Sequence, residues 1–219
     1  MILELKSLLK NFGILYSEEL GINLKSKKKE EIFKWFLASI LFGTRISETI
    51  AKNTYKTLEK YRLLTPQKIL AAGWDFLVNP IMREGGYVRY DGKTSDQLLR
   101  NCKTLLKKYK DLSKLHEEAK DSKDLKNKLL EFYGVGPTTA NIFLRELRGI
   151  WPKAKPELSK FANLAAKNLG IKNIEACWKK NKVKGYEFRN FQVALLRLGK
   201  NYCNKNKCDL CPLKKWCKA

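Results

Sequence analysis

Histidine and long apolar runs are almost absent from this chain of 219 residues. Its one histidine, His116, stands among charged residues, so histidine-based metal binding or a histidine-dependent catalytic triad has no support. No run approaches 18 uncharged apolar residues, which excludes a membrane-spanning helix and predicts no membrane partner. The N-terminus lacks a basic segment followed by an apolar core and a small-residue cleavage site. We therefore expect no signal peptide and a reducing, cytoplasmic location.

Acidic residues are also scarce, with 22 Asp and Glu against 45 Lys and Arg, which gives a formal net charge of +23. The basic residues are spread along the whole chain and would attract a polyanion. Nucleic acid is the first candidate, because neutralised phosphates release counterions whatever the base sequence. An alternative is a lysine-rich composition in which runs such as residues 27–29 are ordinary solvated surface.

Strand-like alternation, low-complexity linkers and repeats of fixed period are nearly or wholly missing, which leaves an all-α protein as the prediction. Apolar residues instead recur at the three-and-four spacing of amphipathic helices. Two such stripes are Ile32, Phe33, Phe36, Leu37, Ile40 and Leu41, and Phe188, Phe191, Ala194, Leu195 and Leu198. Glycine and proline separate the predicted helices.

The most informative break is the segment LLEFYGVGPTTAN at residues 129–141. A helix is predicted to end at Tyr133, two glycines permit a tight reversal, and Pro137 suits the first turn of the next helix. Such a helix-hairpin-helix points unpaired backbone N–H groups outward, where they can bind a phosphate. The residues expected to contact DNA there are Gly134, Val135, Gly136 and Thr139, and Val135 is also expected to plug the interior. A monovalent cation at the hairpin is a further candidate ligand.

Four of the six cysteines fall in the last 17 residues, with the spacing C-x4-C-x2-C-x5-C. They are Cys203, Cys208, Cys211 and Cys217. Four thiolates hold either zinc or an iron–sulfur cluster, and the single C-x-x-C favours a [4Fe–4S] cluster over zinc. A disulfide framework would need an oxidising compartment. Cys102 and Cys177 stand alone and are predicted to be small buried residues.

Taken in order, residues 37–45, residues 86–94, the hairpin and the terminal cysteines resemble the helix-hairpin-helix DNA glycosylases of the endonuclease III type. The first cysteine gap is four residues where the family usually has six. The resemblance implies two all-α domains, a six-helix barrel at residues 24–150 and a cluster domain formed by residues 1–23 and 151–219. It implies a monomer that binds double-stranded DNA containing a lesion or mismatch, in a cleft between the domains.

The implied reaction is hydrolysis of the bond between a damaged or mismatched base and its deoxyribose. Aligning the family pattern on Pro152 and Phe161 places Glu157 where a catalytic aspartate belongs, and Thr138 where bifunctional members carry a lysine. A hydroxyl cannot form an imine, so we expect a monofunctional glycosylase. Two alternatives for Glu157 and Thr138 stay open: Glu157 only faces a helix dipole, or Lys153, Lys155 or Lys160 supplies an amine for lyase chemistry.

The resemblance also implies DNA contacts in three loops. Thr44 and Arg45 match the segment that fills the gap left by the flipped base, and Tyr87 and Arg89 match the segment that wedges into the opposite strand. The expected phosphate contacts of the cysteine segment are Lys205, Lys207, Lys214 and Lys215. A non-catalytic relative that binds kinked DNA and a zinc-stapled RNA-binding protein remain the other candidate functions.

Overall fold

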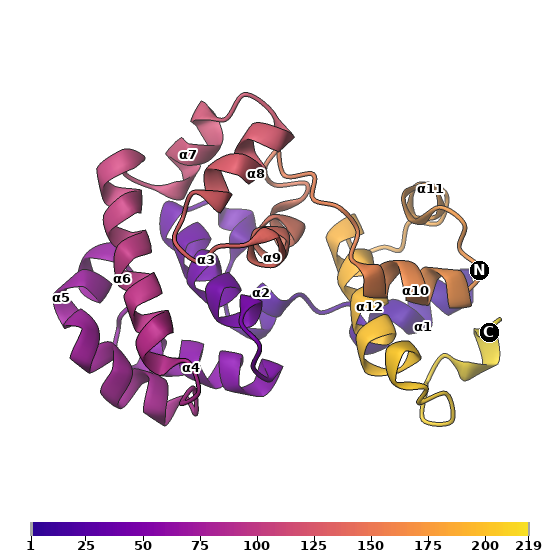
Figure 1. Ribbon diagram of the computed structural model, residues 1–219. Coiled ribbons are helices and arrows are strands. Elements are labelled where there is room, and N and C mark those ends of the chain that lie inside the picture. The colour runs from indigo at the N-terminus through magenta and orange to yellow at the C-terminus, as the bar shows by residue number, and fades with distance from the viewer. Residues whose placement is uncertain (1, 219) are drawn as a thin grey trace. The chain divides into compact units, whose positions relative to one another are not determined.

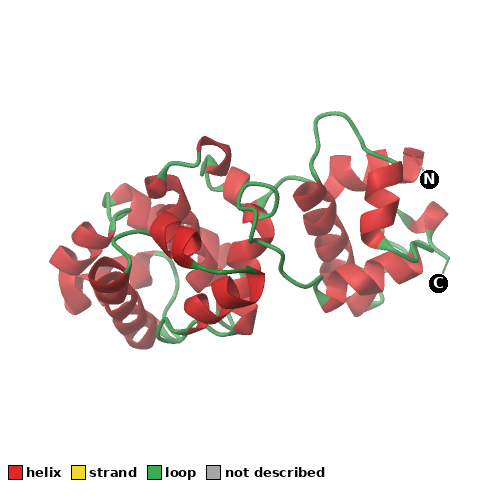
Figure 2. Cartoon of the chain, turned by 90° about the horizontal axis from the view of Figure 1, so that it is seen from above, coloured by secondary structure: helices red, strands yellow, loops and turns green. Residues whose placement is uncertain are grey.

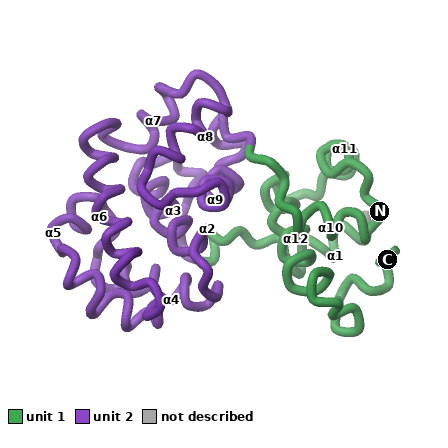
Figure 3. Tube along the Cα trace, viewed as in Figure 1, with its two compact units in different colours: residues 1–19, 156–219 green, residues 20–155 purple. Residues whose placement is uncertain are grey.

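The computed structural model describes residues 2–218, and within that range it contains helices and no strand, so the predicted all-α class is confirmed (Figure 2). No helix in residues 2–218 is long and apolar enough to cross a membrane. The chain divides into two compact units (Figure 3). Unit 2 runs from Leu20 to Lys155, and unit 1 contains the residues up to Glu19 and those from Pro156 onward. The boundaries expected from the sequence were 23/24 and 150/151.

Unit 2 is built from seven α-helices among the described residues, with two short helical segments (Figure 1). They are η1 (Leu24–Ser26), α3 (Lys29–Gly43), α4 (Glu48–Lys60), α5 (Pro66–Phe76), the π-helical η2 (Leu77–Met82), α6 (Asp91–Lys108), α7 (Leu112–Glu118), α8 (Ser122–Leu130) and α9 (Pro137–Leu147). Side-chain oxygens cap several of their first turns, as Ser47 does for α4 and Thr65 for α5. Such caps satisfy N–H groups that have no partner within the helix.

An aromatic cluster around α3 forms the core of unit 2. Trp35 is fully buried, and its indole N–H donates to the carbonyl oxygen of Phe143 at 3.0 Å. The ring of Phe36 meets those of Phe132 and Phe143 edge-on, at 5.2 and 5.4 Å between centroids. Because Phe132 precedes the hairpin and Phe143 lies on α9, these contacts fix both arms of the hairpin to α3.

Unit 1 joins the N-terminal helices to the C-terminal ones. Its elements are α1 (Ile2–Phe12), α2 (Tyr16–Glu19), α10 (Lys160–Asn168), α11 (Ile174–Lys180), α12 (Phe188–Asn201), η3 (Cys203–Lys205) and η4 (Lys214–Trp216). Asn190 on α12 donates to the carbonyl of Gly13 at 2.9 Å, and Arg197 pairs with Glu19 at 2.8 Å. A Cβ on Gly199 would collide with the carbonyl oxygen of Phe161, so α10 and α12 approach more closely than a side chain would allow.

The single histidine belongs to the packing of unit 2. Its ring stacks on Trp151, with 4.5 Å between centroids and 15° between planes. The Lys153 ammonium donates to the carbonyls of His116 and Glu117 at 2.9 and 3.0 Å, near the end of α7. Burial, reinforced by the Lys153 charge, lowers the pKa of His116. The folded protein therefore holds this imidazole neutral at a pH where the unfolded chain already protonates it.

Because the pKa of His116 is lowered in the folded protein, we expect the free energy of unfolding to decrease as the pH is lowered. As pH drops from 7 through the unfolded pKa of about 6.5, the unfolded chain binds a proton that the folded chain refuses, so stability falls by at most about 1.4 kcal/mol per pH unit. His116→Phe keeps an aromatic ring on Trp151 and removes the titration. Urea unfolding at several pH values between 7 and 5.5 should give a flatter profile for the variant. Parallel profiles would contradict the interpretation.

Candidate nucleic-acid interface

The hairpin between α8 and α9 is closed by backbone hydrogen bonds. The N–H of Val135 donates to the carbonyl of Phe132 at 3.0 Å, and the N–H of Ala140 makes the first bond of α9, to Gly136, at 3.0 Å. Gly134 has φ +69, a left-handed conformation that favours glycine. These residues form the predicted tight reversal, although α8 ends at Leu130 and not at Tyr133 as the sequence predicts.

The two glycines of the hairpin have different roles. A Cβ on Gly134 would lie 2.9 Å from the side chain of Gln97 on α6, so this glycine allows a close packing contact as well as a positive φ. Gly136 has φ −90, and no heavy atom lies within 4 Å of a Cβ built on it. Its missing side chain leaves open space in front of the backbone. Gly134 therefore serves the fold, whereas Gly136 leaves room for a ligand.

The first turn of α9 carries N–H groups without a side-chain cap. Gly136 is the N-cap and its residue type has no oxygen to offer, while Pro137 has no N–H. Among residues 2–218, the N–H groups of Gly136, Thr138 and Thr139 have no hydrogen-bond partner. At α8, by contrast, the Asp121 carboxylate accepts from two backbone N–H groups. The start of α9 can therefore accept an anion with its dipole and its open donors.

Two hairpin residues expected to contact DNA are placed differently. The side chain of Val135 is 4% exposed, as expected of a plug, but its N–H is already bonded to Phe132, so the prediction of a DNA contact is wrong. The side chain of Thr139 is 5% exposed, which leaves only its backbone N–H for a phosphate. The expected plug and the expected phosphate donor are thus separate residues. At Val135, the side chain is buried and the N–H is bonded to Phe132, and these are the groups that the motif pattern assigned to a DNA contact.

The loop after α3 lies against the hairpin. A Cβ on Gly43 would collide with the hydroxyl of Thr139, so the Thr139 side chain packs directly on the backbone at the end of α3. Figure 1 shows α3 and α9 as neighbouring helices. Thr44 ends α3, with its N–H on the carbonyl of Leu41 at 3.4 Å. The next residue, Arg45, is exposed. Arg45 is therefore a surface residue two positions after the glycine that contacts Thr139, and its expected contact with DNA stays a prediction.

Tyr87 is the clearest correction. It is fully buried, its hydroxyl oxygen accepts from Thr94 at 3.2 Å, and burial raises its pKa against the opposing hydrogen bonds of Thr44 and Thr94. The ring therefore anchors the turn from inside and cannot stack on a base. The residues that the turn exposes are Val88, at 63%, and Arg89. Val88 was missed because an apolar residue in a sequence is normally assigned to the core.

These contacts bring three separate segments together in unit 2. Gly43 meets Thr139, Thr44 meets Tyr87, and Gly134 meets Gln97 near the turn that leads into α6. We call the following residues the hairpin surface: Arg45, Val88, Arg89 and Thr138, which are exposed, and Gly136, which is partly exposed. The surface combines two cations, one apolar side chain and uncapped backbone donors.

Glu157 and Thr138 lie in different units. Glu157 is exposed and stands in the segment before α10, whereas Thr138 is exposed at the start of α9. Ser159 caps α10 by accepting from the N–H of Ala162, and the first turn of α10 contains no acid. Glu157 lies two residues before this N-cap, so the alternative that it faces the dipole at the start of α10 stays a prediction.

The cysteine segment is a series of tight turns after α12. The N–H of Lys207 returns to the carbonyl of Tyr202 at 3.1 Å, and the N–H of Lys218 reaches the carbonyl of Asn168 at 2.7 Å, which ties the segment to α10. Leu213 is buried and anchors the middle. The segment is thus held at both ends by backbone bonds.

The terminal thiols influence one another electrostatically. Burial raises the pKa of Cys203, and Cys211 and Cys217 add to the shift; burial likewise raises the pKa of Cys211, with Cys217 and Cys208 adding. All six cysteines are free thiols. Within residues 2–218, no three His, Cys, Asp or Glu side chains are already gathered as ligands of one metal ion. The donor set, four reduced thiols of which Cys203, Cys211 and Cys217 interact electrostatically with one another and Cys208 with Cys211, has the chemistry that a cluster or zinc requires.

The basic residues of this segment are only partly available to phosphates. Lys205 and Lys207 are exposed. Lys214 pairs with Asp209 at 2.6 Å, and the Lys215 ammonium lies 4.1 Å from the centroid of the Trp216 ring. Both contacts are at the surface and cost little to break. Elsewhere Cys102 is buried, with its pKa raised to about 12, and Cys177 is half-buried.

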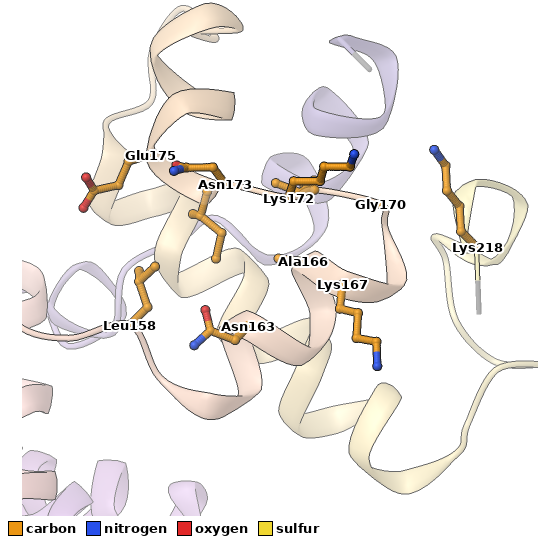
Figure 4. A pocket seen from close by; sticks show the side chains of 11 residues that line it. Leu158, Asn163, Ala166, Lys167, Gly170, Lys172, Asn173, Glu175 and Lys218 are labelled. Carbon is orange, nitrogen blue, oxygen red and sulfur yellow. The ribbon is translucent and has the colours of Figure 1, made fainter.

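A pocket of about 700 Å³ opens in unit 1 between α10, the start of α11 and Lys218 (Figure 4). Lys167, Lys172 and Lys218 line it, with Glu175 as the one acid of the lining. Figure 4 shows these lysine side chains leaving the pocket in different directions, without converging on one point. None of the predicted site residues lines it, so we do not assign the site to this pocket.

Models of known protein families and the sequences of curated proteins give no match to this chain. Its function is therefore inferred from its own residues. The hairpin surface is the part of the protein whose geometry best suits a nucleic acid. Glu157 and the terminal cysteines are the groups whose catalytic and metal-binding roles are to be tested.

The four terminal cysteines should bind a metal centre, and the centre should depend on each of them. We expect protein purified without oxygen to be brown and to contain iron and sulfide, because four thiolates suit a [4Fe–4S] cluster. Cys208→Ser should lose most of the iron. Cys177→Ser, a change to a half-buried cysteine outside the segment, should keep it. Colourless protein carrying zinc would favour a zinc site, and protein without any bound metal would contradict both.

Proposed function

We propose that this protein is a DNA glycosylase, which flips a damaged or mismatched base out of duplex DNA and hydrolyses its N-glycosidic bond. The observation that carries the proposal is the start of α9, where uncapped N–H groups lie beside the exposed residues of two other loops. The net charge of +23 supports a polyanionic partner.

The hairpin would hold the DNA backbone. The N–H groups of Gly136, Thr138 and Thr139 would donate to one phosphate, and the open space at Gly136 would let that phosphate approach the backbone. Contacts of this kind fix the register of the duplex without reading its bases. Such binding tolerates any sequence around a lesion.

The two neighbouring loops would open the duplex. Val88 is an exposed apolar side chain on a turn held from inside by Tyr87, so it is suited to be a wedge between bases. Proteins that kink DNA commonly insert an apolar residue in this way. Arg45 is long enough to reach into the gap left by a flipped base. Extrusion costs a few kcal/mol, least at a damaged or mismatched pair, which gives selectivity.

Hydrolysis would be carried out by Glu157 and water. As the bond from C1′ to the base nitrogen breaks, positive charge grows on the sugar, and a carboxylate stabilises it. The carboxylate takes a proton from the water whose oxygen bonds to C1′. The base leaves with the electron pair of the broken bond and then takes up that proton, which restores the carboxylate. Thr138 cannot form an imine, so the product keeps an abasic sugar in an intact strand.

The terminal cysteines would hold a [4Fe–4S] cluster as a structural element. Four protein thiolates leave no open coordination position for a substrate, so the cluster would fold the segment that carries its lysines. Lys205 and Lys207 would then contact phosphates directly, and Lys214 and Lys215 would first leave Asp209 and Trp216. These contacts add charge but no base recognition.

A non-catalytic protein that binds kinked DNA is the second candidate. The observation that favours it is a glutamate, shifted by one residue, where the family carries its catalytic aspartate, together with the missing lysine. A lyase that uses Lys153 is less well supported, because its ammonium donates to two carbonyls at the end of α7. Lys155 and Lys160 are exposed and keep the lyase alternative open.

We expect the wild-type protein to excise at least one base from a panel of duplexes, and Glu157→Gln to slow excision by about a hundredfold or more, since it removes the charge that stabilises the sugar. The panel contains uracil, thymine glycol, oxidised guanine, alkylated adenine and mismatches. Alkali cleaves the abasic products, which are then counted.

The matched control is Glu175→Gln, which removes another exposed carboxylate of unit 1 and should leave the rate unchanged. Duplex affinity of both variants should stay within about twofold of wild type, because neither loses a phosphate contact. Tight binding without excision on any substrate would favour the non-catalytic candidate. Efficient trapping by borohydride would contradict the role given to Thr138.

A further inference from the structure

An exposed tryptophan stands beside the hairpin surface and has no part in the function proposed so far. Trp74, at the end of α5, is 48% exposed, whereas Trp35, Trp151 and Trp178 are buried. Phe76, two residues later, is 39% exposed. Exposure alone assigns no ligand to a single aromatic side chain, so a ligand is inferred from how this ring is held and from what surrounds it.

Trp74 is held in a fixed orientation. Its indole N–H donates to the carbonyl of Gly92 at 3.0 Å, and a Cβ on Gly92 would lie 3.0 Å from Cζ2 of the ring. The preceding Gly73 has φ +74 and interrupts α5, with no heavy atom within 4 Å of a Cβ built on it. Gly73 therefore lets the chain turn the ring out of α5, and Gly92 leaves space for one edge of the ring on the first turn of α6.

The surroundings of the ring suit a nucleic acid. Gly92 follows the turn that exposes Val88 and Arg89, and Lys93 is exposed next to it. The acids of this region are Asp91, whose carboxylate accepts from the N–H of Gly92 at 2.7 Å, and Asp75. The proposed wedge and the ring are thus joined by the start of α6. A base displaced by the wedge would lie near an exposed aromatic ring.

We propose that Trp74 stacks on an unpaired base of a DNA strand next to the wedge. A ring that is already held pays little conformational entropy on binding, and every base has a face on which to stack. A docking site for a protein would require a larger apolar patch than Trp74 and Phe76 provide. This inference rests on the proposed function, since it takes DNA as the ligand, and it adds a preference for duplexes that contain unpaired bases.

The preference is tested by binding to three DNAs: a fully paired duplex, the same duplex with a short internal bubble, and one of its single strands. Tryptophan emission and anisotropy of labelled DNA are both followed. We expect the wild-type protein to bind the bubble more tightly than the paired duplex, with quenching of emission. Trp74→Ala should weaken binding to the bubble and the single strand about 5- to 100-fold, the range for one stacked base. Its affinity for the paired duplex should change by less than about twofold.

Three further variants guard against a loss of folding. Trp74→Phe keeps a ring and should recover most of the bubble affinity. Gly92→Ala keeps the indole but displaces it, so it should weaken binding to the bubble, although alanine suits a helix better than glycine does. Trp178→Phe changes a buried tryptophan of unit 1, outside the proposed DNA contacts, and should retain both the quenching and the affinity.

Equal affinity of wild type for the bubble and the paired duplex would overturn the inference, as would a Trp74→Ala protein that keeps the bubble preference. The outcome is separable from that of the proposed function. A protein that excises no base but loses its bubble preference with Trp74 would reject the glycosylase and keep the stacking contact. If the wild-type protein excises a base and the Trp74→Ala protein keeps the bubble preference, the glycosylase proposal stands and the stacking contact is rejected.

Discussion

Two glycines, at positions where a side chain of their own would collide with a neighbouring side chain, hold the start of α9 in place. Gly43 lets α3 touch Thr139, and Gly134 lets the hairpin touch Gln97 of α6. Interiors packed at this density have few alternative arrangements, so the position of the α9 N–H groups is set by α3 and α6 together. The aromatic contacts of Phe36 with both arms of the hairpin reinforce it. The proposed phosphate site depends on this rigidity.

The same packing explains which sequence predictions the structure corrects. Helix periodicity and glycine breaks are local signals, and they located the hairpin and the all-α class. Whether a turn residue faces the core depends on elements far away in the chain. Tyr87 is buried, with Thr44 and Thr94 hydrogen-bonded to its hydroxyl, whereas the next residue, Val88, is exposed. No pattern within residues 86–91 carries that information.

The proposed chemistry is shared between the two units. The open N–H donors belong to unit 2, and Glu157 and the cysteines belong to unit 1. The sequence indicated each group by its type and spacing, as four cysteines in 17 residues indicate a metal site. It could not indicate that Lys214 and Lys215 have partners, since Asp209 and Trp216 are common surface neighbours. The pairing of surface charges is set by side-chain rotamers that a sequence does not fix.

The central claim is that backbone N–H groups at the start of α9 bind a DNA phosphate. Amide resonances of Gly136, Thr138 and Thr139, followed by NMR as duplex DNA is added, test it most directly. The account predicts that these three amides shift and exchange more slowly with solvent in the complex, while the N–H of Val135, already bonded to Phe132, changes little. Saturating duplex that leaves the amides of Gly136, Thr138 and Thr139 unchanged would contradict it.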